Sequence, residues 1–246
     1  MIDLNEYTED WGKVSLKDLS EVALTKRVDN KYVFSRSQLI PLLAQMKKSY
    51  KILEINNNRF FQYRTIYFDT PNFQFYLDHH NCRVKRKKVR MREYVDSGLK
   101  FYEIKNKLPG QETDKKRFVI DQLADELSSK HYKRIENERF RGLMLEKKLT
   151  NQFNRMTFAQ IDTHERITID TNIEFLADKK YAEIPNVVVL ELKQPRYDVT
   201  SDMVQILKKM RIYPDSFSKY VMGVVLLDLH QKQNEFKPQK LKINKL

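Results

Sequence analysis

The residues with the clearest chemical potential are cations that recur at every second position of a strand-like segment. In NCRVKRKKVRMREY, the residues Arg86, Lys88, Arg90 and Arg92 share one face of an extended strand with Tyr94. An Arg guanidinium matches phosphate oxygens with its planar fork, and a Lys ammonium acts as a point charge. A strand with four such side chains on one face is therefore suited to holding a chain of phosphates.

The same alternation recurs in six further segments. The positions between the charged residues, which face the other side of each strand, are often aliphatic, as at Ile104, Ile167 and Leu190. This alternation predicts a core on the side away from the charges. The pattern therefore predicts a β-barrel with a polar lumen. The further lumen cations are Arg27 and Lys31 in RVDNKYVF, Lys105 in FYEIKNK, Lys115 and Arg117 in DKKRFVI, Arg155 in NRMTF, Arg166 in RITID, Lys193 in VVVLELK, and Lys219 in SFSKY.

Four acidic residues occupy strand positions that face the predicted lumen together with the cations: Asp29, Glu103, Asp170 and Glu191. They neutralise only part of the cations, and unpaired buried ions are costly, so a multiply charged anion is expected to neutralise the rest. Carboxylates beside phosphates also suit a divalent cation. Glu191 is the first candidate metal ligand, with Asp29 and Glu103 next. A buried salt bridge to a neighbouring Arg is an equally good interpretation of Glu191.

Composition limits the kinds of partner and compartment. A formal net charge of +13 favours a polyanionic partner, such as nucleic acid, nucleotide, polyphosphate or an anionic membrane surface. Only five glycines occur in 246 residues, without a Walker A or GxGxxG pattern, so side chains must hold the anion. The acidic start MIDLNEYTEDWG lacks an apolar signal core, and no run reaches the length of a membrane span. We therefore expect a cytoplasmic protein without an integral membrane segment.

The elements that must position these side chains are expected to form one α+β domain over residues 1–246. Helices are predicted in SRSQLIPLLAQMKKS, over 121–148, in SDMVQILKKM and over 218–229. KILEI and RFFQYRTIYFD are predicted to pair with each other across three asparagines, and VDSG is predicted to turn the basic strand into FYEIKNK. Residues 231–246 are expected to be a solvated basic tail.

Taken in order, these motifs resemble the VTC domain, the polyphosphate polymerase domain of the vacuolar transporter chaperone complex. The resemblance extends from about residue 25 to about 227 and rests on RVDNKYVF, YRTIYFDTPNFQFY, KRKKVRMREY, FYEIKNK, KKRF, RITIDTN, VLELK and SFSKY. That domain belongs to the triphosphate tunnel metalloenzymes, the CYTH-like superfamily. The resemblance implies a closed, antiparallel, eight-stranded β-tunnel with helices packed outside.

The resemblance also implies a reaction, in which the γ-phosphate of ATP is transferred to a growing polyphosphate chain with Mn²⁺ or Mg²⁺. A tripolyphosphatase and a non-catalytic polyphosphate-binding module are the alternatives. Nucleic acid is disfavoured because the cations alternate with aliphatic rather than aromatic residues. Together, parity and resemblance give a catalytic set of Arg90, Arg92, Lys105, Arg166 and Lys219, a substrate-binding set of Arg27, Lys31, Lys88, Lys115, Arg117, Arg155 and Lys193, and metal ligands Glu191, Asp29 and Glu103.

Two positions depart from the patterns of the superfamily. Where its members open with ExExK, this chain has RVDNK, so Arg27 replaces one glutamate and Asp29 the other. Where the eukaryotic polymerase pattern has a lysine three residues before its last lysine, this chain has Ser216 before Lys219.

Overall fold

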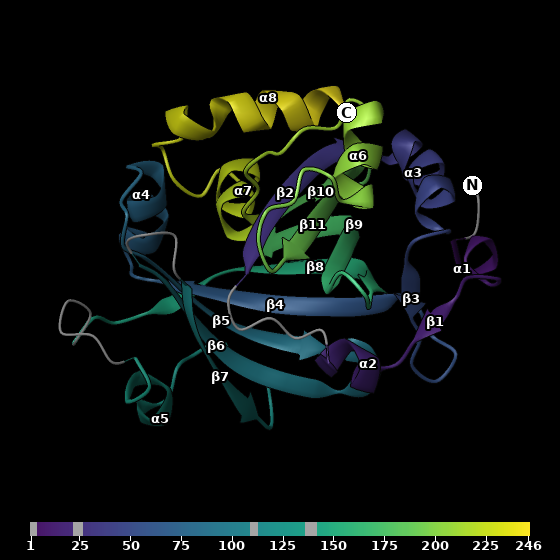
Figure 1. Cartoon of the computed structure of the whole chain (residues 1–246). Coiled ribbons are helices and arrows are strands. Elements are labelled where there is room, and N and C mark those ends of the chain that lie inside the picture. Colours follow the sequence, from purple (N-terminus) through teal and green to yellow (C-terminus); the bar gives the residue numbers. More distant parts are fainter. Residues whose placement is uncertain (1–3, 22–26, 109–112, 136–141) are drawn as a thin grey trace.

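A curled antiparallel sheet forms the centre of the computed structural model, which describes residues 4–21, 27–108, 113–135 and 142–246 (Figure 1). The sheet has eleven strands, and three of them, β1 (Lys13–Val14), β3 (Lys51–Leu53) and β10 (Lys180–Ile184), lie off its main path. Neighbouring strands along the main path are antiparallel. In spatial order the path is β2 (Val28–Ser35), β11 (Val187–Gln194), β9 (Glu165–Ala177), β8 (Glu146–Gln160), β4 (Phe61–Asp69), β5 (Arg86–Tyr94), β6 (Leu99–Lys107) and β7 (Thr113–Ile120).

The predicted closure of the tunnel is not confirmed as a hydrogen-bonded barrel. β2 and β7 are the two ends of the path, and no ladder joins them within the described residues. The sheet still curls (Figure 1), and Lys31 of β2 and Lys88 of β5 reach two consecutive residues, Phe217 and Ser218. Lys31 Nζ donates to the Phe217 carbonyl at 2.8 Å, and Lys88 Nζ donates to Ser218 Oγ at 3.0 Å. Side chains, rather than a backbone ladder, bring the two halves of the sheet together.

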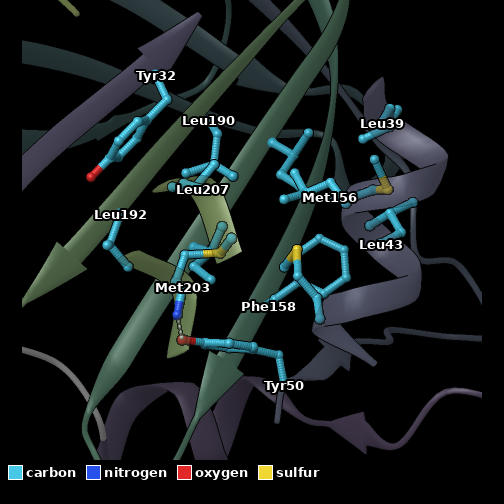
Figure 2. Close-up of a cluster of buried hydrophobic side chains, with 14 of the residues drawn as sticks. Tyr32, Leu39, Leu43, Tyr50, Met156, Phe158, Leu190, Leu192, Met203 and Leu207 are labelled. Atoms are coloured by element: carbon cyan, nitrogen blue, oxygen red, sulfur yellow. Dashed lines mark hydrogen bonds between the residues drawn. The ribbon is translucent and has the colours of Figure 1, made fainter. Parts of the chain in front are cut away.

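Two predicted helices cover the outer face of the sheet half formed by β2, β11, β9 and β8. They are α3 (Leu39–Met46), which follows a capped turn at Ser35, and α6 (Asp202–Lys209), whose cap is Ser201. Their apolar stripes pack on the aliphatic residues of the strands, and the Met203 amide donates to Tyr50 Oη at 3.2 Å (Figure 2). Burial on this face explains why every second residue of these strands is aliphatic.

The long helical segment predicted over 121–148 is wrong for the residues that the structure describes. It contains only the four-residue α5 (Ser129–Tyr132), and β8 already begins at Glu146, while 136–141 lie outside the described residues. Its apolar residues, including Leu123 and Leu127, pack irregularly on the outer face of β4, β5 and β6. The apolar spacing therefore reflects burial against the sheet rather than a helical period.

Two further predictions are wrong, one about strand pairing and one about the C-terminal segment. β3 does not pair with β4; it pairs antiparallel with β8 and parallel with β1. The segment 231–246 is not a solvated tail, because it forms the short turn η5 (Asn234–Phe236) and α8 (Lys237–Lys245), with Phe236 and Ile243 buried. These two side chains anchor the segment in the same apolar cluster as α7 (Lys219–Leu226).

The remaining helices are α1 (Leu4–Tyr7), α2 (Leu16–Glu21) and α4 (Gln74–His80). α4 and α8 lie beside α7 at one end of the sheet (Figure 1). Over the described ranges, none of the helices combines the length and the apolar character needed to cross a bilayer.

Candidate anion-binding face

The strand register places the predicted cations on one face of the sheet, which we call the inner face. Residues directly opposite each other on antiparallel strands point to the same side, so the pairs can be followed from strand to strand. Apart from Arg27, directly before β2, and Lys219, on α7, all predicted site residues lie on this face. The connecting pairs are Asp29–Lys193, Lys31–Glu191, Lys193–Arg166, Glu191–Thr168, Asp170–Arg155, Thr65–Arg92, Arg90–Glu103, Lys88–Lys105, Lys105–Lys115 and Glu103–Arg117.

Glu103, on β6, is enclosed by cations from both neighbouring strands. Its Oε2 pairs with Arg90 at 2.7 Å, and its Oε1 pairs with Lys115 at 2.6 Å and Arg117 at 2.8 Å. The side chain is only 1% exposed. Burial alone would raise the pKa of Glu103, but Arg90, Arg92 and Lys115 hold that pKa well below its usual range. Glu103 is therefore a permanent anion that neutralises part of this wall.

Asp170, on β9, ties α7 to the opposite wall. Its two oxygens accept from Arg155, from Nε at 2.6 Å and from Nη2 at 2.8 Å, and Oδ2 also pairs with Lys219 at the start of α7. Burial raises the pKa of Asp170, but the two cations outweigh it and lower that pKa to about 2. Burial lowers the pKa of Lys219 to about 8 despite the same pair. The first residue of α7 is thus fixed against β9.

The third acidic group lies where β11 meets β2. Glu191 Oε2 pairs with Lys193 at 2.8 Å, and Asp29 contacts both the same ammonium at 3.9 Å and Arg27 at 2.9 Å. Burial raises the pKa of Glu191, yet Lys193 and Lys31 hold it well below the usual range. Two carboxylates therefore flank one lysine, in partial agreement with the salt-bridge interpretation of Glu191.

Four lysines of the inner face have no carboxylate within 4 Å among the described residues: Lys31, Lys88, Lys105 and, at the end of β6, Lys107. Burial, followed by the charge of Lys31, lowers the pKa values of Lys88 and Lys105. β2 lies at one end of the sheet path, and β5 and β6 lie near the other end. Lys31 and Lys88 both reach residues 217–218, so the curl brings the unneutralised positive charge of these strands together.

Three contributions to this site were missed by the sequence analysis. Residues 217–219 contact three separate strands, through Phe217, Ser218 and Lys219, and so hold α7 against the inner face. The SFSKY motif indicated only the lysine. The second missed contribution is His79, a buried neighbour of the inner-face cations. Burial, together with Lys88 and other nearby cations, lowers the pKa of His79 to about 2, so the imidazole adds no further positive charge.

Asp69, in the YFDTP motif, is the third missed residue. Its carboxylate accepts from the amides of Phe75 at 2.8 Å and Tyr76 at 2.9 Å at the start of α4, and from Tyr220 Oη at 2.6 Å. Burial raises the pKa of Asp69. The residue fastens α4 and α7 to the end of β4, so the motif positions the helices around the site rather than contacting an anion.

The donor set agrees with a metal that is shared with a phosphate rather than enclosed by protein. Within the described ranges, no three His, Cys, Asp or Glu side chains form a cluster that would hold a metal. Mg²⁺-type ions bound to phosphates use only one or two carboxylates. Glu191 and Asp29, which face the same ammonium, provide such a pair, whereas both oxygens of Glu103 are already paired with cations.

The chain resembles known proteins both in sequence and in fold. The VTC domain family model matches residues 26–228. The chain is similar to the solved structure of a putative adenylyl cyclase from Hippeastrum, described as having a dominant triphosphatase activity, with 13% identity, a TM-score of 0.50, and coverage of 80% of this chain and 94% of that one. It is also similar to a putative adenylate cyclase from Vibrio parahaemolyticus, with 16% identity, a TM-score of 0.47, and coverage of 81% and 99%. The comparison with curated proteins gave no match.

Proposed function

The chain belongs to the VTC domain family, and from this premise we propose that it is a metal-dependent polyphosphate polymerase. In this proposal the inner face binds the triphosphate of ATP, and the γ-phosphoryl group passes to the end of a polyphosphate chain. If water takes the place of that acceptor, the same face hydrolyses tripolyphosphate; the Hippeastrum protein is described as having a dominant triphosphatase activity.

The observation that supports the proposal most directly is the group of lysines without carboxylate partners. Lys31 and Lys88 contact residues 217 and 218, and Lys105 lies directly opposite Lys88 on the neighbouring strand. Holding such ammonium groups together without a counter-ion costs free energy, because each loses hydration and repels the others. A triphosphate returns that free energy on binding, so the site favours a multiply charged anion over a single carboxylate.

The arginines are held ready for a phosphate by the acids behind them. Glu103 orients Arg90, and Asp170 binds Arg155 with both oxygens and also holds Lys219. Groups fixed in this way need little reorganisation when charge develops on the transferring phosphoryl group. We therefore assign Arg90, Arg92, Lys105, Arg166 and Lys219 to stabilising the reacting phosphate, and the other inner-face cations to binding the rest of the chain.

We propose that Glu191, with Asp29, would hold the divalent metal, and that Glu103 is a counter-ion. When bound, Mn²⁺ or Mg²⁺ neutralises phosphate oxygens and supports their alignment for in-line transfer. Lys193 Nζ lies between the two carboxylates, at 2.8 Å from Glu191 and 3.9 Å from Asp29. It would have to turn from these carboxylates toward a phosphate to make room.

The test compares the wild-type chain with Glu191→Gln, which keeps the side-chain shape but removes the charge that a hard cation needs. We expect tripolyphosphate binding without metal, measured by calorimetry, to persist or tighten, and Mn²⁺ binding, measured by electron paramagnetic resonance, to weaken. Product formation from ATP and Mn²⁺, resolved on a polyphosphate gel, should collapse. Glu183→Gln, at an exposed position on β10, is the matched control.

Two results would contradict the proposal at different points. Turnover of Glu191→Gln at the wild-type level, with unchanged metal dependence, would show that Glu191 is only the partner of Lys193. Orthophosphate as the sole product of the wild-type protein, even with polyphosphate added as acceptor, would replace the polymerase with the hydrolase.

A further inference from the structure

The inner face changes from charged to apolar along three adjacent strands. Arg92 on β5 lies opposite Phe101 on β6, which lies opposite Val119 on β7; Tyr94 lies opposite Leu99. Toward α7, the rows of β5 and β6 carry only charged side chains. From the charged to the apolar end, the rows are Arg86, Lys88, Arg90, Arg92, Tyr94 on β5; Lys107, Lys105, Glu103, Phe101, Leu99 on β6; and Lys115, Arg117, Val119 on β7.

We call Tyr94, Leu99, Phe101 and Val119 the apolar end of the inner face. Leu99 is 50% exposed and Val119 is 70% exposed, and Tyr94 and Phe101 are half-buried. The rings of Tyr94 and Phe101 lie 5.3 Å apart between centroids. The Arg117 guanidinium lies 4.7 Å from the Phe101 centroid. The surface thus combines aromatic rings with a flat cation, the two kinds of side chain on which nucleobases stack.

A bare phosphate chain makes no use of this end, because every unit of such a chain is charged. A ligand that matches the whole row has a polyanionic part and an apolar, planar part joined in line. Arg90 and Tyr94 are four residues apart, or about 13 Å at the usual rise of about 3.3 Å per residue. An extended nucleoside triphosphate spans such a distance from its base to its terminal phosphate.

We propose that the apolar end is a nucleobase subsite, on which the base of a nucleoside triphosphate stacks while its phosphates extend along Arg92 and Arg90 toward Lys105. This inference rests on the proposed function, because it assumes that the cations of the inner face bind the triphosphate. It adds the direction in which the nucleotide lies and a reason for the protein to prefer a nucleotide to inorganic triphosphate.

The test separates the base from the phosphates by comparing three ligands: ATP, ribose 5-triphosphate and inorganic tripolyphosphate. Calorimetry with the wild-type chain is expected to show ATP binding at least about fivefold more tightly than ribose 5-triphosphate, the lower limit for one stacked base. Phe101→Leu and Tyr94→Leu should remove most of this difference without changing the affinity for tripolyphosphate. Tyr181→Leu, at an exposed tyrosine on β10, is the control.

Equal affinity of the wild-type protein for ATP and ribose 5-triphosphate would overturn the subsite while leaving the phosphate-binding function intact. This comparison needs no variant and so does not depend on variant folding. Failure of the wild-type chain to bind any of the three ligands would overturn both the subsite and the proposed function. If the apolar end instead contacts a second copy, light scattering will show a wild-type dimer that Phe101→Leu dissociates, and this also overturns the subsite.

Discussion

Replacing Glu103 with Gln is expected to weaken the fold and strengthen anion binding at the same time. The change removes the one negative charge among Arg90, Lys115 and Arg117, which contact it at 2.6 to 2.8 Å. Arg90 is 19% exposed and has few routes to solvent, whereas Lys115 and Arg117 are 33% and 40% exposed and can turn outward. The main loss is therefore the buried pair with Arg90.

Removing one partner of a buried ion pair costs about 3–5 kcal/mol, while each exposed pair adds about 0–1 kcal/mol. We expect the free energy of unfolding of Glu103→Gln to fall by about 3–7 kcal/mol in urea at pH 7. For tripolyphosphate the sign reverses, because a repelling charge is gone. At roughly 10 Å and an effective dielectric constant of about 20, that repulsion is worth about 1.7 kcal/mol, so binding should tighten about 17-fold.

The assay is urea denaturation with and without tripolyphosphate, together with calorimetric binding in the absence of metal. Glu93→Gln is the matched control, because Glu93 lies on β5, the neighbour of β6, but pairs with Lys100 at 3.3 Å on the other face, where we expect a loss below about 1 kcal/mol. Unchanged stability, or weaker metal-free binding of tripolyphosphate, would refute the assignment of Glu103 as a counter-ion.

Two further predictions concern α7 and the buried lysines. Burial lowers the pKa values of Lys115 and Lys219 from 10.5 to about 8, so tripolyphosphate affinity should fall as the pH rises through about 8. The unfolded chain binds more protons at these lysines between pH 8 and 10.5, so their contribution to the unfolding free energy of the ligand-free protein should increase over the same range. A decline in tripolyphosphate affinity only near pH 10.5 would contradict the lowered pKa values. Gly223→Ala would place a Cβ 2.8 Å from the Leu149 side chain, and we expect thermal denaturation to show a loss of about 1–3 kcal/mol with weaker tripolyphosphate binding. Gly12→Ala is the control, and wild-type stability of Gly223→Ala would show that α7 is not packed tightly on the inner face.

The inner face was predictable from the sequence because it depends on a local rule. Side chains of a strand alternate between two faces. Charged residues at every second position of RVKRKKVRMREY, and aliphatic residues at the alternate positions of neighbouring strands, therefore identified the two faces of the sheet without knowledge of strand order. The structure confirms this from Arg90 and Glu103 to Lys193. The resemblance to the VTC domain gave the same fold family, and the family match confirms it.

What the sequence could not provide depends on contacts between distant residues. Glu103 is a counter-ion because the register of β5, β6 and β7 places Arg90 and Arg117 on either side of it. The spacing of Leu123 and Leu127 resembled a helix, but the outer face of the sheet buries these residues without one. In the same way, Phe236 and Ile243 turn a lysine-rich segment into part of the core, and their burial depends on α7. Each of these outcomes is set by tertiary packing, which overrides local propensity.

The contacts of residues 217–219 also determine when the binding face comes into existence during folding. β5, β6 and β7 follow one another as antiparallel neighbours, with Glu103 among their cations, so this meander can form early from local contacts. Lys31, by contrast, meets Phe217 across 186 positions of the chain, and β2 pairs with β11. Closing such long loops is slow, so we expect Lys31 to join Lys88 and Lys105, which already face each other in the meander, only at a late stage. The repulsion between Lys31 and these two lysines is then deferred until much of the stabilising core has formed.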